Sequence, residues 1–99
     1  MLARTSTWTG SSEALAAWAA SVNATVRPFV ENLEGNAGVF FLIDRAGGRA
    51  LTLTLWKTEA AARASDASAD QSRARTEAAT GVKLLQRGEY EVLDDRKAG

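Results

Sequence analysis

The sequence contains no cysteine and no histidine. Without thiols the chain has no disulfide, no thiolate nucleophile and no cysteine-based metal site. Without imidazoles it lacks histidine acid–base chemistry, histidine metal ligands and a proximal histidine for haem. We therefore expect no metal, no haem and no other cofactor. Small secreted domains often depend on disulfides, so we expect a cytoplasmic protein.

The chain also lacks net charge, because 12 basic residues balance 12 acidic ones. Nucleic acids and anionic membrane surfaces attract clustered positive charge, so we expect neither as a partner. The longest strongly apolar run, Val39 to Ile43, is too short to span a bilayer. The first ten residues contain no apolar run of the kind that marks a signal peptide.

The composition and the length of the chain suit one folded domain over residues 1–99. The composition is 45% hydrophobic and 24% charged, which is typical of globular proteins. A chain of this length buries roughly 60–70% of the surface that its unfolded form exposes, enough for a single core. We see no internal repeat and no linker.

Strict alternation between Leu51 and Trp56 predicts a β-strand, because successive side chains of a strand point to opposite faces. One row is aliphatic (Leu51, Leu53 and Leu55), and the other is mixed (Thr52, Thr54 and Trp56). The mixed row suits the wall of a pocket better than open water. Which row lines a pocket stays open at this stage.

The first third of the chain predicts a strand and a helix. Leu2 to Thr9 is rich in β-branched and aromatic residues and is predicted to be the first strand. A helical stripe of apolar residues follows, with Ser11 or Ser12 as its N-cap. Pro28 lies inside this stripe, so we predict two helical pieces, about residues 12–24 and 27–33. The bend between them either shapes a pocket or lets the helix wrap around its sheet.

Val39 to Asp44 is nearly all apolar, which predicts a second strand buried on both faces. Gly47-Gly48 then predicts a hairpin to the alternating strand. After that strand Thr58 caps a second helix, which runs to about Thr80 and stops at Gly81.

The second helix carries two distinct rows. A row of alanines is predicted to approach the sheet closely or to leave room there; it comprises Ala60, Ala64, Ala67, Ala74 and Ala78. A charged row is predicted to face solvent; it comprises Arg63, Asp66, Asp70, Arg73 and Glu77. Ser65 and its neighbours predict a kink near Ser65–Asp66.

The chain closes with a short apolar segment, Val82 to Leu85, and a predicted fourth strand, Glu89 to Leu93. Residues 94–99 form a charged tail that we expect to be frayed. The order β-α-β-β-α-β predicts a ferredoxin-like α+β fold, in which both helices cover one face of a four-stranded antiparallel sheet. An apolar sheet face without cover calls for a partner, and a second copy is the simplest, so we predict a homodimer.

The chain resembles the dimeric α+β barrel superfamily, in particular domains of the antibiotic biosynthesis monooxygenase type. The resemblance is carried by LTLTLW followed by KTEAAARAS, and it is supported by RPFVENLEGNAGVFFLIDR and by the terminal EYEVL. It covers nearly the whole chain. It implies a dimeric barrel, with a pocket between helices and sheet in each subunit.

The resemblance also implies a function. Its cofactor-independent monooxygenases act on polyphenolic substrates such as anthrones, and a tryptophan at the position of Trp56 lines their pocket. The asparagine that active members place four residues earlier corresponds to Thr52 here, and a tyrosine of some members corresponds to about Ala62. The haem-degrading branch uses a histidine on the second helix, and this sequence contains none.

The candidate site residues are Trp56, Thr52, Thr54, Arg27 and Trp8. Arg27 is a cation that would suit an acidic or phenolate substrate, although a surface role is the alternative. Trp18 either lines the same space or packs in the core, and Tyr90 either donates a proton or packs. Asp66 and Asp70 lie one helical turn apart, but no third ligand accompanies them.

Two functions remain open. One is a cofactor-independent monooxygenase that acts on an aromatic, polyketide-like substrate. The other is a dimeric barrel without catalysis, which binds an apolar aromatic small molecule or has a structural role. The same fold order occurs in RNA-recognition domains, but the basic glycine-aromatic signature of those domains is missing.

Overall fold

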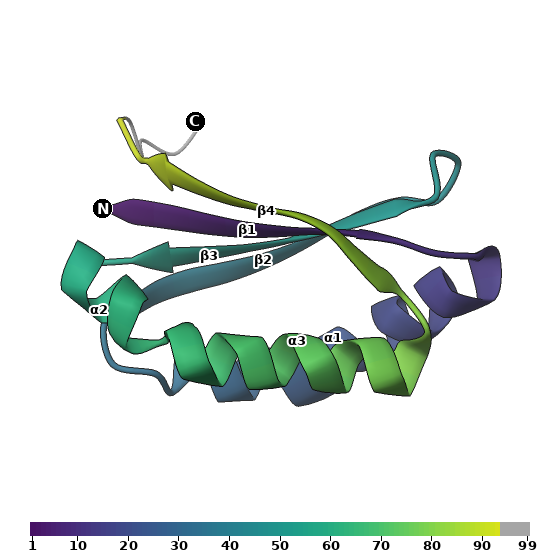
Figure 1. Ribbon diagram of the computed structural model, residues 1–99, viewed down its shortest axis with the longest axis horizontal. Helices are drawn as coiled ribbons and strands as arrows, with labels where there is room; N and C mark the ends of the chain where they lie inside the picture. The colour runs from purple at the N-terminus through teal and green to yellow at the C-terminus, as the bar shows by residue number, and fades with distance from the viewer. Residues whose placement is uncertain (94–99) are drawn as a thin grey trace, which may run out of the picture.

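Strands and helices alternate along residues 1–93, the part of the chain that the computed structural model describes. In chain order they are β1 (Leu2–Thr9), α1 (Ser12–Glu31), β2 (Asn36–Asp44), β3 (Arg49–Trp56), α2 (Glu59–Ala64), α3 (Asp66–Thr80) and β4 (Lys83–Glu91). The strands form one antiparallel sheet in the order β2-β3-β1-β4. The helices lie on one side of it (Figure 1). The predicted ferredoxin-like α+β fold is therefore confirmed.

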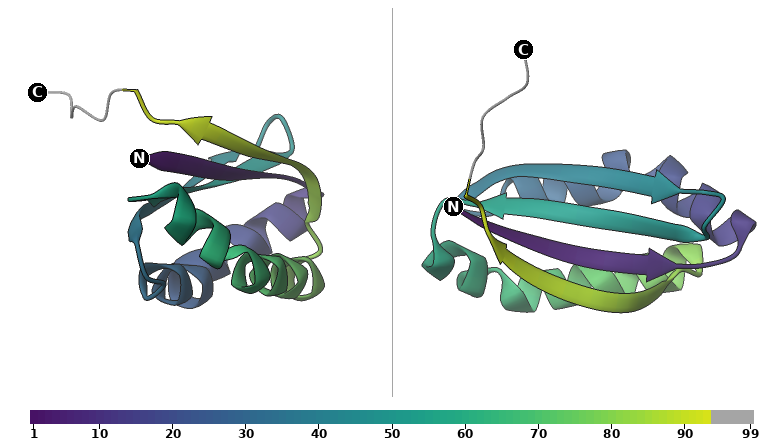
Figure 2. Two further views of the ribbon diagram at one scale, coloured as in Figure 1. Left: turned by 60° about the vertical axis from the view of Figure 1, so that its left-hand side comes forward. Right: turned by 90° about the horizontal axis from the view of Figure 1, so that it is seen from above.

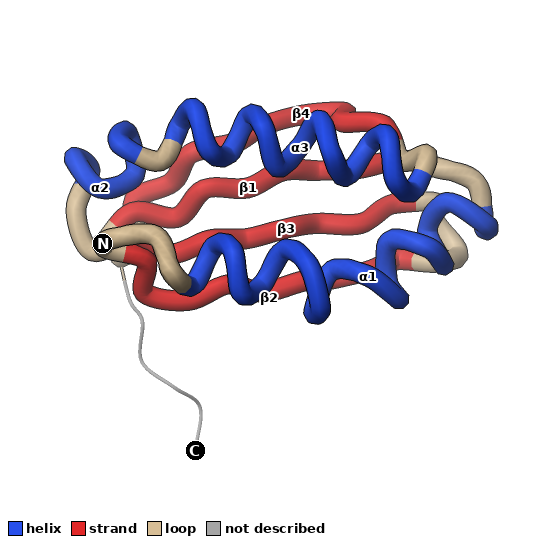
Figure 3. The backbone as a smooth tube through the Cα atoms, turned by 90° about the horizontal axis from the view of Figure 1, so that it is seen from below, coloured by secondary structure: helices blue, strands red, loops and turns tan. Residues whose placement is uncertain are grey.

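The two long helices divide the sheet between them. Seen from the helix side, α1 lies over β2 and β3, whereas α3 lies over β1 and β4 (Figure 3). The predicted hairpin connects β2 to β3, with Asp44 opposite Arg49. The two lateral halves of the sheet are thus covered by helices of different composition.

Helix α1 runs unbroken from Ser12 to Glu31, so the predicted division into two pieces at Pro28 is wrong. Pro28 lies on the exposed side of the helix, and so does Ala24, whose carbonyl would normally accept from residue 28. Water can bond that carbonyl, which explains why the helix tolerates a proline there. At its start, Ser11 is the N-cap, and its Oγ accepts from the backbone N–H of Ala14 at 3.1 Å.

In β3 the mixed row faces the helices. Ala50 and Trp56 are buried there, and cross-strand pairing places the leucines of the same strand on the opposite face. The question that the sequence left open is thereby decided: the Thr52, Thr54 and Trp56 row lies under the helices.

The opposite face of the sheet is apolar and, within residues 1–93, no element covers it (Figure 2). Phe40 is 53% exposed, Leu42 49% and Tyr90 57%. The prediction that β2 is buried on both faces is therefore wrong. β2 is an edge strand, and in one chain the face that carries Phe40 and Leu42 has no protein against it.

Strand β4 begins at Lys83 and ends at Glu91, so the prediction of a separate apolar segment followed by a strand at Glu89–Leu93 is wrong. Gly88 lies between the two predicted pieces. It lies inside the strand, where a Cβ would come within 2.5 Å of Thr5 Oγ1 and 2.7 Å of the Tyr90 ring. The glycine marks a close approach of side chains and not the end of an element. The predicted tail, residues 94–99, lies outside the described residues.

The second helical region is kinked at Ser65 and ends at Gly81, whose φ is +86°, and both features are as predicted. The prediction that its alanine row faces the sheet, however, is wrong. The alanine row is exposed (Ala60, Ala64, Ala67, Ala74 and Ala78). The half-buried residues that α3 turns toward the sheet are mostly polar, and they include Ser72, Arg73 and Thr76.

The main core lies between α1 and the sheet. It is built from Trp8, Ala14, Leu15, Trp18, Val22, Ala50 and Val82. Helix α3 adds no buried residue to it. Among residues 1–93, no helix is both long and apolar enough to cross a membrane.

Candidate functional site

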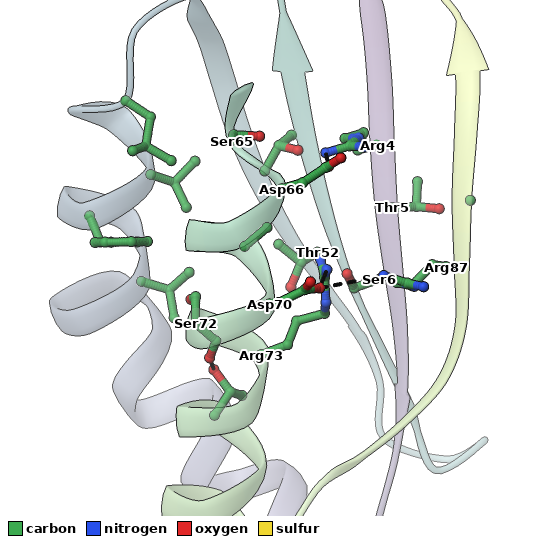
Figure 4. A pocket seen from close by; sticks show the side chains of 18 of the residues that line it. Arg4, Thr5, Ser6, Thr52, Ser65, Asp66, Asp70, Ser72, Arg73 and Arg87 are labelled. Carbon is green, nitrogen blue, oxygen red and sulfur yellow. Dashed lines mark hydrogen bonds and ion pairs between the residues drawn. The ribbon is translucent and has the colours of Figure 1, made fainter. Parts of the chain in front are cut away.

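A cavity of about 460 Å³ lies between the sheet, α1 and α3. Pockets for small ligands typically measure about 300–1,000 Å³, so the cavity is of ligand size. Its walls come from elements far apart in the sequence: α1, the kink and inner face of α3, the middle of β1 and β3, and the edge strand β4 (Figure 4).

One side of the cavity is apolar and largely aromatic. Trp8, Trp18, Val26, Phe29, Val30, Leu33 and Trp56 line it. All three tryptophans of the sequence are in this set, and each is at most 3% exposed. Aromatic surfaces of this kind stack on planar apolar ligands.

The floor of the cavity carries two threonines that are already bonded to tryptophans. The indole Nε1 of Trp8 donates to Thr52 Oγ1 at 3.2 Å. The indole Nε1 of Trp56 donates to Thr54 Oγ1 at 2.9 Å. These bonds hold both rings in place and engage both hydroxyl oxygens as acceptors.

The side formed by α3 and β4 is charged. Arg4 on β1 pairs with Asp66 at the start of α3. Asp70, one turn later, pairs with Arg73 on its own helix and lies 3.4 Å from Arg87 of β4 (Figure 4). The Arg73 side chain is only 19% exposed, so this cation is held at the cavity and not in bulk water.

The two aspartates of this wall serve to hold arginines. The hydrogen bond from Arg4 keeps the pKa of Asp66 below its ordinary value, which outweighs the opposing effect of partial burial. Arg4 Nη1 also donates to the carbonyl of Ala62 at 2.8 Å, which ties β1 to the end of α2. Among residues 1–93, no group of three or more acidic side chains is arranged to hold a metal ion.

Glu89 is a third carboxylate of the lining. It lies opposite Arg4 in the pairing of β1 with β4, on the face that the helices cover. Within the described part of the chain it has no ion pair, in contrast to Asp66 and Asp70. The cavity therefore presents one carboxylate that is not engaged by an arginine.

Four of the five candidates from the sequence meet in this cavity: Trp8, Thr52, Thr54 and Trp56. Arg27 is not among its lining residues. Its guanidinium donates to Asn23 at 2.9 Å and to the carbonyl of Val39 at 3.3 Å, and it lies 5.2 Å from the centre of the Phe41 ring. Arg27 thus ties α1 to the edge strand.

Other residues were placed differently by sequence reasoning. Trp18 lines the cavity and also packs in the core, while Tyr90 lies on the uncovered face of the sheet. Of the charged row that was predicted to face solvent, Asp66 and Asp70 are exposed and also border the cavity. The prediction is wrong for Arg73, whose side chain is only 19% exposed. The one-turn spacing of the two aspartates was the available signal, but spacing alone does not say which side of a helix meets a sheet.

Comparison with known proteins gives no sequence relative. No protein-family model matches the chain, and no curated protein matches it significantly. Solved structures that are similar in fold include three from Deinococcus and Streptomyces. A Deinococcus radiodurans protein assigned as an antibiotic biosynthesis monooxygenase is 17% identical, with a TM-score of 0.76, and the match covers 100% of this chain and 99% of that one.

The other two structures come from Streptomyces. A monooxygenase of Streptomyces coelicolor, in complex with nanaomycin D, is 12% identical over 99% of this chain and 92% of that one, with a TM-score of 0.72. SnoaB of Streptomyces nogalater, a cofactor-independent oxygenase in mutant form, is 16% identical over 94% of this chain and 93% of that one, with a TM-score of 0.69. The chain thus has the fold of antibiotic biosynthesis monooxygenases, as its sequence resemblance predicted.

Proposed function

We propose that the protein is a cofactor-independent monooxygenase that acts on an aromatic, polyketide-like substrate of the anthrone or polyphenol class. The observation that carries this proposal is the cavity of about 460 Å³, with tryptophans on one side and arginines on the other. The apolar side suits a planar ring system, and the arginines suit the anion that such a substrate forms when it loses a proton.

The chemistry resides in the substrate. Loss of a proton from the activated methylene gives a carbanion, which transfers electrons to molecular oxygen and then forms a carbon–oxygen bond with it. One oxygen atom stays on the carbon as a carbonyl group, and the other leaves as water with the two methylene hydrogens. The protein orients the ring, excludes water and stabilises the anion.

Three groups have distinct roles in this proposal. Trp56, Trp8 and Trp18 hold the ring. Arg73 stabilises the negative charge, because its partly buried cation interacts more strongly than one in bulk water. Glu89 takes up the proton, since Asp66 and Asp70 are held by arginines.

The experiment is oxygen uptake by the purified protein with a panel of anthrones and hydroquinones. We expect uptake by the wild type and at least a tenfold lower rate in Trp56→Phe and Glu89→Gln variants. Ala78→Ser, on the exposed side of α3, is the control. No uptake with a substrate that demonstrably binds would instead identify a binding protein without catalysis.

We also propose that the protein is a homodimer in which two sheets pack face to face. Phe40, Leu42 and the three leucines of β3 form an apolar face that one chain leaves open. A second copy offers an identical apolar surface, and the zero net charge of the chain produces little repulsion between copies.

The dimer is tested by sedimentation equilibrium. Leu53 lies at the centre of the face, opposite Phe40 on one side and Thr5 on the other. Leu53→Lys is expected to give a monomer, whereas Ala74→Lys adds the same charge to the exposed side of α3 and leaves the dimer intact. A wild-type protein that sediments as a monomer would refute this assembly.

A further inference from the structure

Strand pairing sets Arg4 directly opposite Glu89. The two residues face each other in the antiparallel pairing of β1 with β4, and both line the cavity. Residues opposed in this way have Cβ atoms roughly 4.5–5.5 Å apart, and opposite charges in such positions attract each other. The sheet alone therefore predicts an ion pair between Arg4 and Glu89.

Arg4 has another partner in the structure. It pairs with Asp66 at the start of α3, and its Nη1 donates to the carbonyl of Ala62 at 2.8 Å (Figure 4). Its side chain is 24% exposed, so the charge is partly buried and favours a nearby carboxylate. Within residues 1–93, Glu89 forms no ion pair. One cation thus lies between two carboxylates, and the carboxylate of the helix holds it.

The break between α2 and α3 provides both acceptors for Arg4. In an unbroken helix the carbonyl of Ala62 would accept from the backbone N–H of Asp66. Helix α2 ends at Ala64 instead, and the Ala62 carbonyl accepts from Arg4 and from Ser65 Oγ, the latter at 2.6 Å. Helix α3 begins at Asp66, so this carboxylate lies in a first helical turn, where negative charge is favourable. The kink therefore holds the guanidinium on the helix side of the cavity.

We propose that Asp66 is a positioning residue, which holds Arg4 away from Glu89 and so keeps the Glu89 carboxylate available to accept the proton of the substrate. The inference rests on the proposed function. In that reaction the C–H bond of the activated methylene breaks, the proton forms an O–H bond with Glu89, and the electron pair stays on the substrate. A carboxylate paired with Arg4 is a weaker base, because the cation stabilises its ionised form.

The other charged groups near Glu89 are already paired or more distant. Besides Arg4 and Asp66, the groups on this side of the sheet are Asp70 and Arg73 of α3 and Arg87 and Glu91 of β4. Asp70 pairs with both of these further arginines. Glu91 lies two residues along β4 from Glu89 and is therefore only diagonal to Arg4. An Arg4 side chain that leaves Asp66 thus meets Glu89 first.

Oxygen uptake with anthrone, measured across a range of pH, tests the proposal. Asp66→Asn removes the negative charge and keeps the size of the side chain. We expect uptake near neutral pH to fall roughly two- to fivefold, the strength of one exposed ion pair. The acid side of the rate profile should move to lower pH, because Arg4 then keeps Glu89 ionised. The lost negative charge would by itself favour the substrate anion and raise the rate, so a rise contradicts the proposal.

A second substitution separates positioning from a loosened attachment of α3. In Asp66→Asn/Arg4→Gln the cation is absent and Glu89 has no arginine opposite it, so uptake should be at least twofold faster than in Asp66→Asn. If Asp66 only attaches α3, the double variant is as slow as the single variant or slower. Glu59→Gln is the matched control. It removes one carboxylate from the exposed Glu59–Arg63 pair of α2 and should keep the wild-type rate and pH profile.

The crystal structure of Asp66→Asn gives a readout that does not depend on turnover. We expect the Arg4 guanidinium within about 4 Å of the Glu89 carboxylate. An Arg4 that stays at position 66 overturns the proposal. If Arg4 moves but the wild type takes up no oxygen with an anthrone that binds, the arrangement of Arg4 stands and the proposed function fails. If the wild type takes up oxygen and Asp66→Asn is equally fast, the positioning role fails and the proposed function stands.

Discussion

Helices α1 and α3 lie side by side on the same face of one sheet, yet they contribute opposite things to it (Figure 3). Helix α1 turns five buried residues inward: Ala14, Leu15, Trp18, Val22 and Val30. Helix α3 buries none, and the residues that it contributes to the cavity are one alanine and otherwise serine, threonine, arginine and aspartate. One helix builds the core, and the other stands away from the sheet and bounds a cavity.

The contrast explains how so short a chain keeps a cavity of ligand size. A helix that packs tightly needs large apolar side chains, which would fill the space. Helix α3 is attached instead by charged contacts at its two ends and middle: Arg4 with Asp66, Arg87 with Asp70, and Glu77 with the N–H of Leu84 at 3.0 Å. These contacts hold the helix at a distance without closing the cavity.

The largest expected effect is on stability, from a change in α1. Leu15→Ala removes a side chain that is 1% exposed, so we expect a loss of about 2–5 kcal/mol in the free energy of unfolding. Ser72→Ala on the inner side of α3 should change it by less than about 0.5 kcal/mol. Chemical denaturation measures both values. Similar losses in the two variants would show that α3 is part of the core after all.

A change in α3 should instead affect ligand binding. Ala69 lines the cavity, and Ala69→Phe places a ring in the open space. We expect at least a tenfold loss of affinity for an aromatic probe, with the unfolding free energy within about 1 kcal/mol of the wild type. Ala74→Phe, on the exposed side of the same helix, is the matched control. Calorimetric titration distinguishes the two; equal affinities would show that the ligand binds elsewhere.

The smallest expected effect concerns pH. Arg4 holds the pKa of Asp66 below its ordinary value of 3.8, so the ionised pair stabilises the attachment of α3. That contribution is complete above the ordinary value and is lost as pH falls through the lower pKa of the folded protein. Amide hydrogen exchange in the first turns of α3 should therefore accelerate only below about pH 3.8, after correction for the intrinsic rate.

Two variants sharpen the pH measurement. Asp66→Asn should show the faster exchange already at neutral pH and little further change in acid. Asp44 also has a lowered pKa, because the backbone N–H of Gly47 and the side chain of Arg49 bond it at the hairpin. Asp44→Asn should change exchange at the hairpin and leave α3 unaffected. Acceleration confined to the hairpin in the wild type would argue against a role for Asp66.

Sequence reasoning succeeded where a local rule suffices. The alternation in β3, the cap at Ser11, the hairpin at Gly47-Gly48 and the stop at Gly81 each depend on a few adjacent residues. It failed where a distant contact overrides the local signal. The last strand was predicted to begin at Glu89, but pairing with β1 extends β4 back to Lys83.

For the same reason, sequence reasoning identified only part of the candidate site. Trp8, Thr52, Thr54 and Trp56 lie on strands whose alternation assigns each to a row. The charged wall lies on a helix whose only apolar residues are alanines. Burying a methyl group yields roughly 0.8 kcal/mol, so an alanine row has little power to turn a helix toward a sheet.

The sequence by itself therefore determined the order of elements, the faces of the strands and the rows that each helix carries. Only the tertiary structure decided which row of α3 meets the sheet, because that choice depends on contacts with other segments, among them the pair of Asp66 with Arg4 of β1. Periodicity within a segment records which residues share a side. The partners that select the side belong to other segments.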